Sequence, residues 1–206
     1  LHEHTDSHLL QDALTTASTI YIVSDGGAKE HYGSFGFVIA LDHDVLWHGK
    51  GVARGHPIHS FRAESYGRLA SLRFIFQYLR YHHIDMHPEC TIKAFTDSKS
   101  LIQREEKESE WLDYYPSACL KADQDVLRLI KETRDNLPCN TDCTHVKGHQ
   151  DTDDSNEPLS YEADLNVLAD HLATKALNHS MTTTVSPPQM LLLPSCKVYV
   201  IHKNVT

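Results

Sequence analysis

The chain has 206 residues, 40% hydrophobic and 23% charged, which is enough for one folded domain with additional terminal segments. It contains no apolar run long enough for a membrane helix, and its N-terminus lacks the basic and apolar parts of a secretory signal. The net charge of −9, with 19 Lys and Arg against 28 Asp and Glu, argues against a function that depends on non-specific nucleic-acid binding through a basic face.

The five cysteines form no recognisable disulfide framework. This favours a reduced, intracellular protein, with nucleus and cytoplasm equally open. The chain begins with Leu1 and not with Met, so we expect a processed product or a segment of a longer protein.

The first part of the chain predicts an arm followed by three strands. Residues 1–18 are polar and His-rich, with weak helical periodicity, and we interpret them as a lead-in arm. The apolar run Ile20–Val23 stops at Asp25 and two glycines, which predicts a buried central strand. The runs 35–40 and 45–47 flank a turn-like segment and predict a meander with the first strand.

Helices and strands alternate in the remainder. The expected elements are a helix from the N-cap candidate Ser60 to about Tyr81, a strand over 92–95, a helix with apolar positions Val126, Leu127, Ile130 and Thr133, a strand over 141–146, and a helix over 161–178. This order predicts a mixed sheet with helices packed on it. We expect one domain over 19–180, followed by a linker and a β-prone tail over 181–206.

Three acidic residues lie where a strand or helix meets a loop. Asp25 and Asp97 each follow a strand, and Glu64 lies in the first turns of the long helix. If the two strands are parallel neighbours, their carboxylates project side by side, and Glu64 reaches them from the helix above. Such a group requires cations to neutralise it, and its hard oxygen ligands suit magnesium or manganese.

A fourth candidate, Asp170, lies at the margin of the apolar stripe of the last helix. Asn166 lies one turn away on the same side of that helix. A single acid on a helix is more often simply solvated, and Glu162 and Asp164 are competing acids nearby. The company of three other acids in suitable positions favours Asp170 as part of the same site.

His149 belongs to a strand that runs into a Gly-containing loop. A His on such a loop beside a metal site can pass a proton to a leaving group. Two alternatives remain open: an ordinary surface His, and a zinc site that also includes Cys139, Cys143 and His145. The zinc alternative lacks the paired Cys-x-x-Cys spacing that makes such an assignment strong.

Five fragments of the chain together resemble the ribonuclease H family, in particular its type 1 members. The fragments, which occur in the family's order, are Val23-Ser24-Asp25-Gly26-Gly27, Arg62-Ala63-Glu64, Phe95-Thr96-Asp97-Ser98, His145-Val146-Lys147-Gly148-His149 and Asn166-Val167-Leu168-Ala169-Asp170-His171-Leu172-Ala173. The resemblance covers residues 19 to about 179. It implies an α/β ribonuclease H-like fold with a five-stranded mixed sheet of strand order 3-2-1-4-5, flanked by helices.

The resemblance also implies an activity and a set of roles. Members hydrolyse the RNA strand of an RNA–DNA hybrid with two Mg²⁺ ions, for which Mn²⁺ can substitute, and leave 5′-phosphate and 3′-hydroxyl ends. The residues that match the metal ligands are Asp25, Glu64, Asp97 and Asp170, and His149 matches the residue that aids proton transfer or product release. The positions that match hybrid contacts are Gly26, Gly27, Ser98 and Asn166.

Two departures from the family pattern suggest a context. The segment 104–115 is acidic where some members carry a basic substrate-binding handle, and the loop between His149 and Asp170 is long and acidic. The wording Val-Lys-Gly-His-Gln-Asp and the missing Met resemble ribonuclease H domains fused behind reverse transcriptases of eukaryotic retroelements. A reverse transcriptase domain upstream would supply the contacts for binding the hybrid that this acidic domain lacks.

Three other interpretations compete with this one. The chain could be another two-metal nuclease of the same fold, such as a transposase or a resolvase, or a non-catalytic connector or binding module. A structural zinc module is the third. The presence of all four carboxylates argues against the non-catalytic module, and the final Asn/Asp helix argues against the other nucleases.

Overall fold

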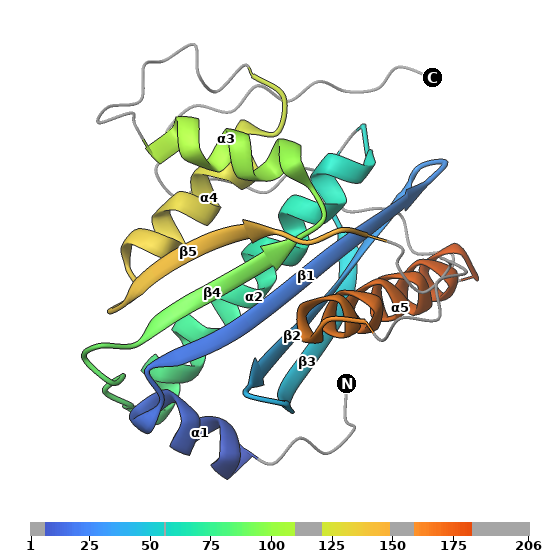
Figure 1. Ribbon diagram of the computed structural model, residues 1–206. Coiled ribbons are helices and arrows are strands. Elements are labelled where there is room, and N and C mark those ends of the chain that lie inside the picture. Colours follow the sequence, from blue (N-terminus) through green and yellow to red (C-terminus); the bar gives the residue numbers. More distant parts are fainter. Residues whose placement is uncertain (1–6, 56, 110–120, 149–158, 183–206) are drawn as a thin grey trace.

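The computed structural model describes residues 7–55, 57–109, 121–148 and 159–182, which form five strands and five helices (Figure 1). In chain order these are α1 Ser7–Thr16, β1 Thr19–Lys29, β2 Tyr32–Leu41, β3 Asp44–Ala53, α2 Ser60–His82, β4 Thr91–Thr96, α3 Lys99–Ser109, α4 Gln124–Asp135, β5 Asn140–His145 and α5 Tyr161–Thr182. The strands make one sheet of order β3-β2-β1-β4-β5, which confirms the predicted topology.

The first strand is longer than the sequence pattern indicates. The pattern predicts that β1 stops before Asp25, and this boundary is wrong, because β1 continues through both glycines to Lys29. Its parallel pairing with β4 ends at Val23↔Phe95, but its antiparallel pairing with β2 continues to Lys29↔Tyr32. Asp25 therefore lies where β1 has left β4 and is still held by β2.

Helices cover both faces of the sheet and enclose a core on each side. α2 crosses one face, with α3 and α4 beside it, and α5 covers the other face (Figure 1). Successive side chains of a strand point to opposite faces, so Ile22 packs in the core beneath α2 and Val23 in the core beneath α5. None of the helices within the described ranges combines the length and apolarity needed to span a membrane.

The described part of the expected N-terminal arm is a helix that belongs to the folded unit. Leu10 and Leu14 of α1 are fully buried and join the core beneath α2. The backbone N–H of His87 donates to the carbonyl of Leu14 at 3.1 Å and ties α1 to the segment before β4. Residues 7–16 of the expected arm thus form a short helix that buries Leu10, Ala13 and Leu14 against the sheet and leaves Leu9 exposed.

Candidate active site

Asp25 lies at the contact between β1 and α2. Its side chain is 6% exposed, and the backbone N–H of Gly26 donates to its Oδ1 at 2.7 Å. A Cβ added to Gly26 would lie 2.2 Å from the backbone nitrogen of Glu64, so only glycine permits this close approach of strand and helix. The approach places Glu64 beside the buried carboxyl of Asp25.

The other three predicted carboxylates all act electrostatically on Asp25. Burial raises the pKa of Asp25 to about 8, and the negative charge of Asp97 adds to the rise. Asp170 and Glu64 raise this pKa further, and the hydrogen bond from Gly26 opposes the rise. The fold thus brings Glu64, Asp97 and Asp170 within electrostatic reach of Asp25, although the four acids are spread over 145 residues of sequence.

Glu64 is held by a neighbour that the sequence does not single out for this purpose. Burial raises the pKa of Glu64, while a hydrogen bond with Ser98 lowers it, and Asp97 raises it again. The hydroxyl of Ser98 also accepts the backbone N–H of Leu101 at 3.4 Å, in the first turn of α3. Ser98, expected to contact substrate, therefore serves to position Glu64 and to cap α3.

The start of α2 is fixed by His59, not by the expected N-cap Ser60. The Nδ1 atom of His59 accepts the backbone N–H of Arg62 at 3.4 Å. With that nitrogen acting as the acceptor, Nε2 carries the hydrogen and faces Asp123 at 3.3 Å. Ser60 becomes the first residue of the helix instead, because the imidazole of His59 already satisfies the free N–H that a serine side chain at the N-cap would have taken.

A buried ion-pair network fixes the same turn to α4. The guanidinium of Arg62, which is 5% exposed, contacts Asp123 through Nη1 at 3.1 Å and Asp125 through Nη2 at 2.6 Å. It also donates from Nε to the carbonyl of Arg54. Arg62 is two residues before Glu64, so these contacts hold the backbone that carries the carboxylate.

α5 is pressed against the opposite face of the sheet. A Cβ at Gly36 would lie 2.2 Å from the carbonyl oxygen of Ala169, and the hydroxyl of Ser34 donates to the carbonyl of Ala173 at 2.7 Å. This contact places Asp170, the residue after Ala169, near Asp25. Asn166 is 2% exposed, and its Oδ1 has no hydrogen-bond partner among the described residues.

The loop expected to carry His149 begins at the carboxylate of Asp97. A Cβ on Gly148 would lie 2.4 Å from Oδ2 of Asp97, so the backbone passes directly over that side chain. His149 itself lies outside the described residues, and its role stays a prediction. A Cβ added to Gly27 would meet nothing closer than Leu177 at 3.8 Å, and the expected contact of Gly27 with substrate also stays a prediction.

The site has the donors for a hard cation, but its carboxylates are not gathered as the ligands of a single ion. No three His, Cys, Asp or Glu side chains of the described ranges stand close enough together to hold a metal ion. The mutual repulsion of bare carboxylates favours side-chain positions that are farther apart than ligands of one ion.

Cys143, one member of the zinc alternative, is engaged by another side chain. It accepts a hydrogen bond from Nη2 of Arg68 at 2.8 Å.

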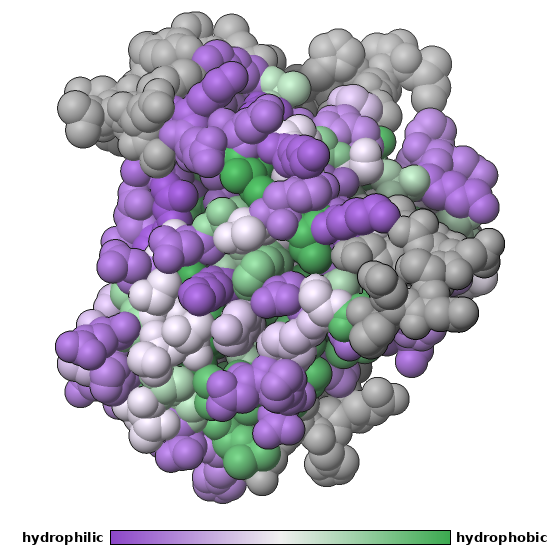
Figure 2. All heavy atoms as spheres, viewed as in Figure 1, coloured by the Kyte–Doolittle hydropathy of each residue, from purple (hydrophilic) through white to green (hydrophobic). Residues whose placement is uncertain are grey.

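The described part of the acidic segment after β4 has a structural function. Glu105 of α3 is 7% exposed and lies 3.3 Å from Nε of the fully buried Arg68. The surface over α3 is mainly hydrophilic (Figure 2). This segment stabilises α3 against α2, and its remainder, including Trp111, lies outside the described residues.

Solved structures with the same architecture are ribonucleases H. The chain superposes on LC11-RNase H1 in complex with an RNA/DNA hybrid with a TM-score of 0.54 at 16% identity, covering 79% of this chain and 99% of that one. The N-terminal RNase H domain of rv2228c from Mycobacterium tuberculosis gives 0.52 at 16% identity, covering 79% and 96%. RNase H1 from the archaeon Halobacterium salinarum gives 0.51 at 17% identity, covering 78% and 98%.

No family model and no curated protein matches the sequence. At these identities the superpositions establish the architecture of the chain. That architecture agrees with the strand order and the helix placement described above. The chain therefore has the ribonuclease H fold.

Proposed function

We propose that this chain is a ribonuclease H, which hydrolyses the RNA strand of RNA–DNA hybrids and leaves 5′-phosphate and 3′-hydroxyl ends. The observation that carries the proposal is the convergence of three other carboxylates on the buried Asp25: burial, and then the charges of Asp97, Asp170 and Glu64, raise the pKa of that group to about 8. A fold that buries an acid beside three others without cations opposes its own stability. Such an arrangement is typical of a site that binds cations to work.

The donor chemistry fits two Mg²⁺ ions, with Mn²⁺ as a substitute. Carboxylate oxygens are the ligands these hard cations prefer, and Asp25, Glu64, Asp97 and Asp170 would hold them. When bound, such ions activate a water and stabilise the departing 3′ oxygen. The buried Oδ1 of Asn166, which has no partner among the described residues, would accept a hydrogen bond from a 2′-hydroxyl of the RNA.

The remaining residues of the site act on position and proton transfer. Ser98 and the Arg62 network keep Glu64 in place, so the carboxylate does not have to be ordered during the reaction. Gly148 carries the loop across Asp97, and this supports a role for the following residue, His149, in moving a proton at the leaving oxygen.

The experiment that tests the proposal is cleavage of an end-labelled RNA–DNA hybrid by the purified chain in Mg²⁺. We expect fragments of the RNA strand with 5′-phosphate ends, and no cleavage once a chelator is added, because four uncompensated carboxylates repel the phosphate. Single-stranded RNA and duplex DNA of the same sequence are the controls and should stay intact. Cleavage of duplex DNA alone would favour a transposase or resolvase activity. Hybrid binding without cleavage in either metal would favour the non-catalytic module.

We propose further that the domain works beside an upstream reverse transcriptase domain. The support is the charge of −9 and the acidic segment in place of a basic handle, which leave few groups to neutralise phosphates. The dissociation constant for hybrid should fall by about tenfold or more when the natural upstream sequence is attached, at fixed salt. Equal affinities with and without that sequence would refute this part of the proposal.

A further inference from the structure

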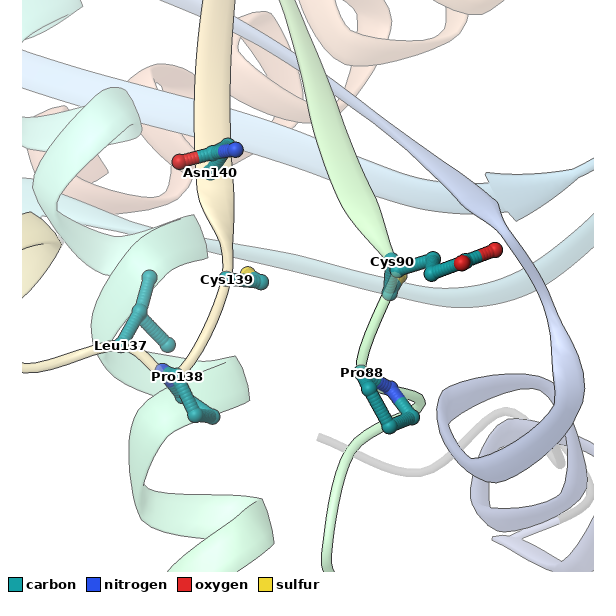
Figure 3. A pocket seen from close by; sticks show the side chains of 7 residues that line it. Pro88, Cys90, Leu137, Pro138, Cys139 and Asn140 are labelled. Carbon is teal, nitrogen blue, oxygen red and sulfur yellow. The ribbon is translucent and has the colours of Figure 1, made fainter.

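A pair of cysteines lies at the start of two neighbouring strands, at the opposite ends of these strands from Asp97. The first Cα partners of the parallel pair β4–β5 are Thr91 and Asn140, and Cys90 and Cys139 each precede these by one residue. The two cysteines therefore lie side by side, each just before the first residue of one of two adjacent strands (Figure 3). Neighbouring strands lie about 4.8 Å apart, which is within the Cα separation of about 4.4–6.8 Å that a disulfide spans.

The thiol of Cys139 is directed onto β4, the strand that Cys90 precedes. It hydrogen-bonds with the backbone N–H of Ile92, two residues after Cys90. Burial raises the pKa of Cys139 to about 11, and the negative charge of a Cys90 thiolate contributes to the rise, so the two sulfurs lie within electrostatic reach. Both thiols are free.

A surface hollow gives access to the pair. Its lining consists of Pro88, Glu89, Cys90, Leu137, Pro138, Cys139 and Asn140 (Figure 3). Cys139 is partly exposed, whereas Cys90 is 2% exposed. A small reagent that enters the hollow therefore reaches Cys139 first and leaves Cys90 as the second, internal thiol.

We propose that Cys90 and Cys139 form a latent disulfide, which a low-molecular-weight disulfide such as oxidised glutathione closes. The Cys139 thiolate attacks one glutathione sulfur; a mixed disulfide forms, the glutathione S–S bond breaks and one glutathione thiolate leaves. Cys90, after losing its proton to solvent, attacks the Cys139 sulfur and releases the second glutathione. Two protein thiols are oxidised, and one glutathione disulfide is reduced to two thiols.

The raised pKa values of both thiols determine how fast the disulfide forms and how easily it is reduced. Only a very small fraction of Cys139 is thiolate at pH 7, so closure is slow and should accelerate by about tenfold for each pH unit below the pKa. Thiols of high pKa are also poor leaving groups, so the closed bond resists reduction. These properties describe a durable link between β4 and β5, not a rapid redox sensor.

The test is to incubate the folded, reduced full chain with oxidised glutathione at pH 7.0 and pH 8.5, and then to alkylate the remaining thiols. Cleavage before Asp, without reductant, separates Cys90 in peptide 85–96 and Cys139 in 135–141 from Cys143 in 142–150. Mass spectrometry should find 85–96 linked to 135–141, formed faster at pH 8.5. The unfolding midpoint should rise by about 5–10 °C, as expected for closing a loop of this length.

Matched variants separate the pair from other thiols. Cys139→Ser should lose the linked peptide and the rise in midpoint, and Cys119→Ser should keep both. Cys90→Ala serves as a second variant: it should retain glutathione on Cys139 as an unresolved mixed disulfide. In the wild type, a persistent mixed disulfide on Cys139, a link to another cysteine, or full alkylation of all cysteines after treatment at pH 8.5 would overturn the proposal. None of these measurements depends on nuclease activity, so the proposed function can fail or succeed independently.

Discussion

Asp97→Asn is expected to lower the rate of RNA-strand cleavage by about a thousandfold or more. The amide keeps the shape of the side chain but removes a negative charge from a group that already influences both Asp25 and Glu64. Loss of one charged ligand weakens cation binding and the stabilisation of charge in the transition state, and a thousandfold corresponds to about 4 kcal/mol. The measurement is the single-turnover rate on a labelled hybrid at saturating Mg²⁺.

The matched control for this substitution is Asp142→Asn. Asp142 is exposed on β5, so the control makes the same change of charge on the neighbouring strand, outside the carboxylate group. We expect its rate to stay within about twofold of the wild type. Equal losses in the two variants would mean that net charge, and not the carboxylate group, governs cleavage.

Asp25→Asn is expected to stabilise the metal-free protein at alkaline pH. The pKa of Asp25 rises from 3.8 in the unfolded chain to about 8 in the folded one, so between these values the folded state holds a proton that the unfolded state has lost. Stability therefore falls as pH rises through this window, by up to roughly 5 kcal/mol once Asp25 is ionised. The neutral amide escapes this penalty.

The check is urea unfolding in the presence of a chelator at pH 5.0 and pH 8.5. The variant should gain several kcal/mol over the wild type at pH 8.5 and much less at pH 5.0, because little of the penalty has accumulated there. Mg²⁺ should stabilise the wild type more than the variant at pH 8.5. A gain in the free energy of unfolding of the same size at both pH values would show that the stabilisation does not come from removing the ionisation of Asp25.

The order of elements and the sheet topology could be predicted because short apolar runs and helical spacing survive in this sequence. Val126, Leu127, Ile130 and Thr133 were expected to form one face of a helix, and all four are buried in α4. The extension of β1 could not be predicted, because two consecutive glycines weaken a strand pattern. Only the partner strand β2 shows that Gly26 and Gly27 remain in the sheet.

The carboxylates of the site could be chosen from the sequence because Asp25 and Asp97 follow apolar strand runs and Glu64 lies in the first turns of a helix. Asp170 was chosen from its place at the margin of the apolar stripe of the last helix. The groups that hold them could not, since they come from distant positions. Arg62 contacts Asp123 and Asp125 across about sixty residues, and nothing in the local pattern indicates this pairing. The hydrogen bond between Ser98 and Glu64 depends on how α2 packs against β1 and beside α3, which periodicity does not report.

Because β1 leaves β4 just before Asp25, the register between these two strands depends on a short paired segment. Only five Cα pairs, from Thr19↔Thr91 to Val23↔Phe95, align these two parallel strands. A slip of one residue would turn the side chains of β1 to the other face of the sheet and carry Asp25 away from Asp97. The same slip would turn Ile20 and Ile22 out of the core beneath α2 and put Thr19 and Tyr21 in their place, so misaligned molecules would be unstable. The packing of the hydrophobic core therefore selects the one register of β1 on β4 that also places Asp25 beside Asp97.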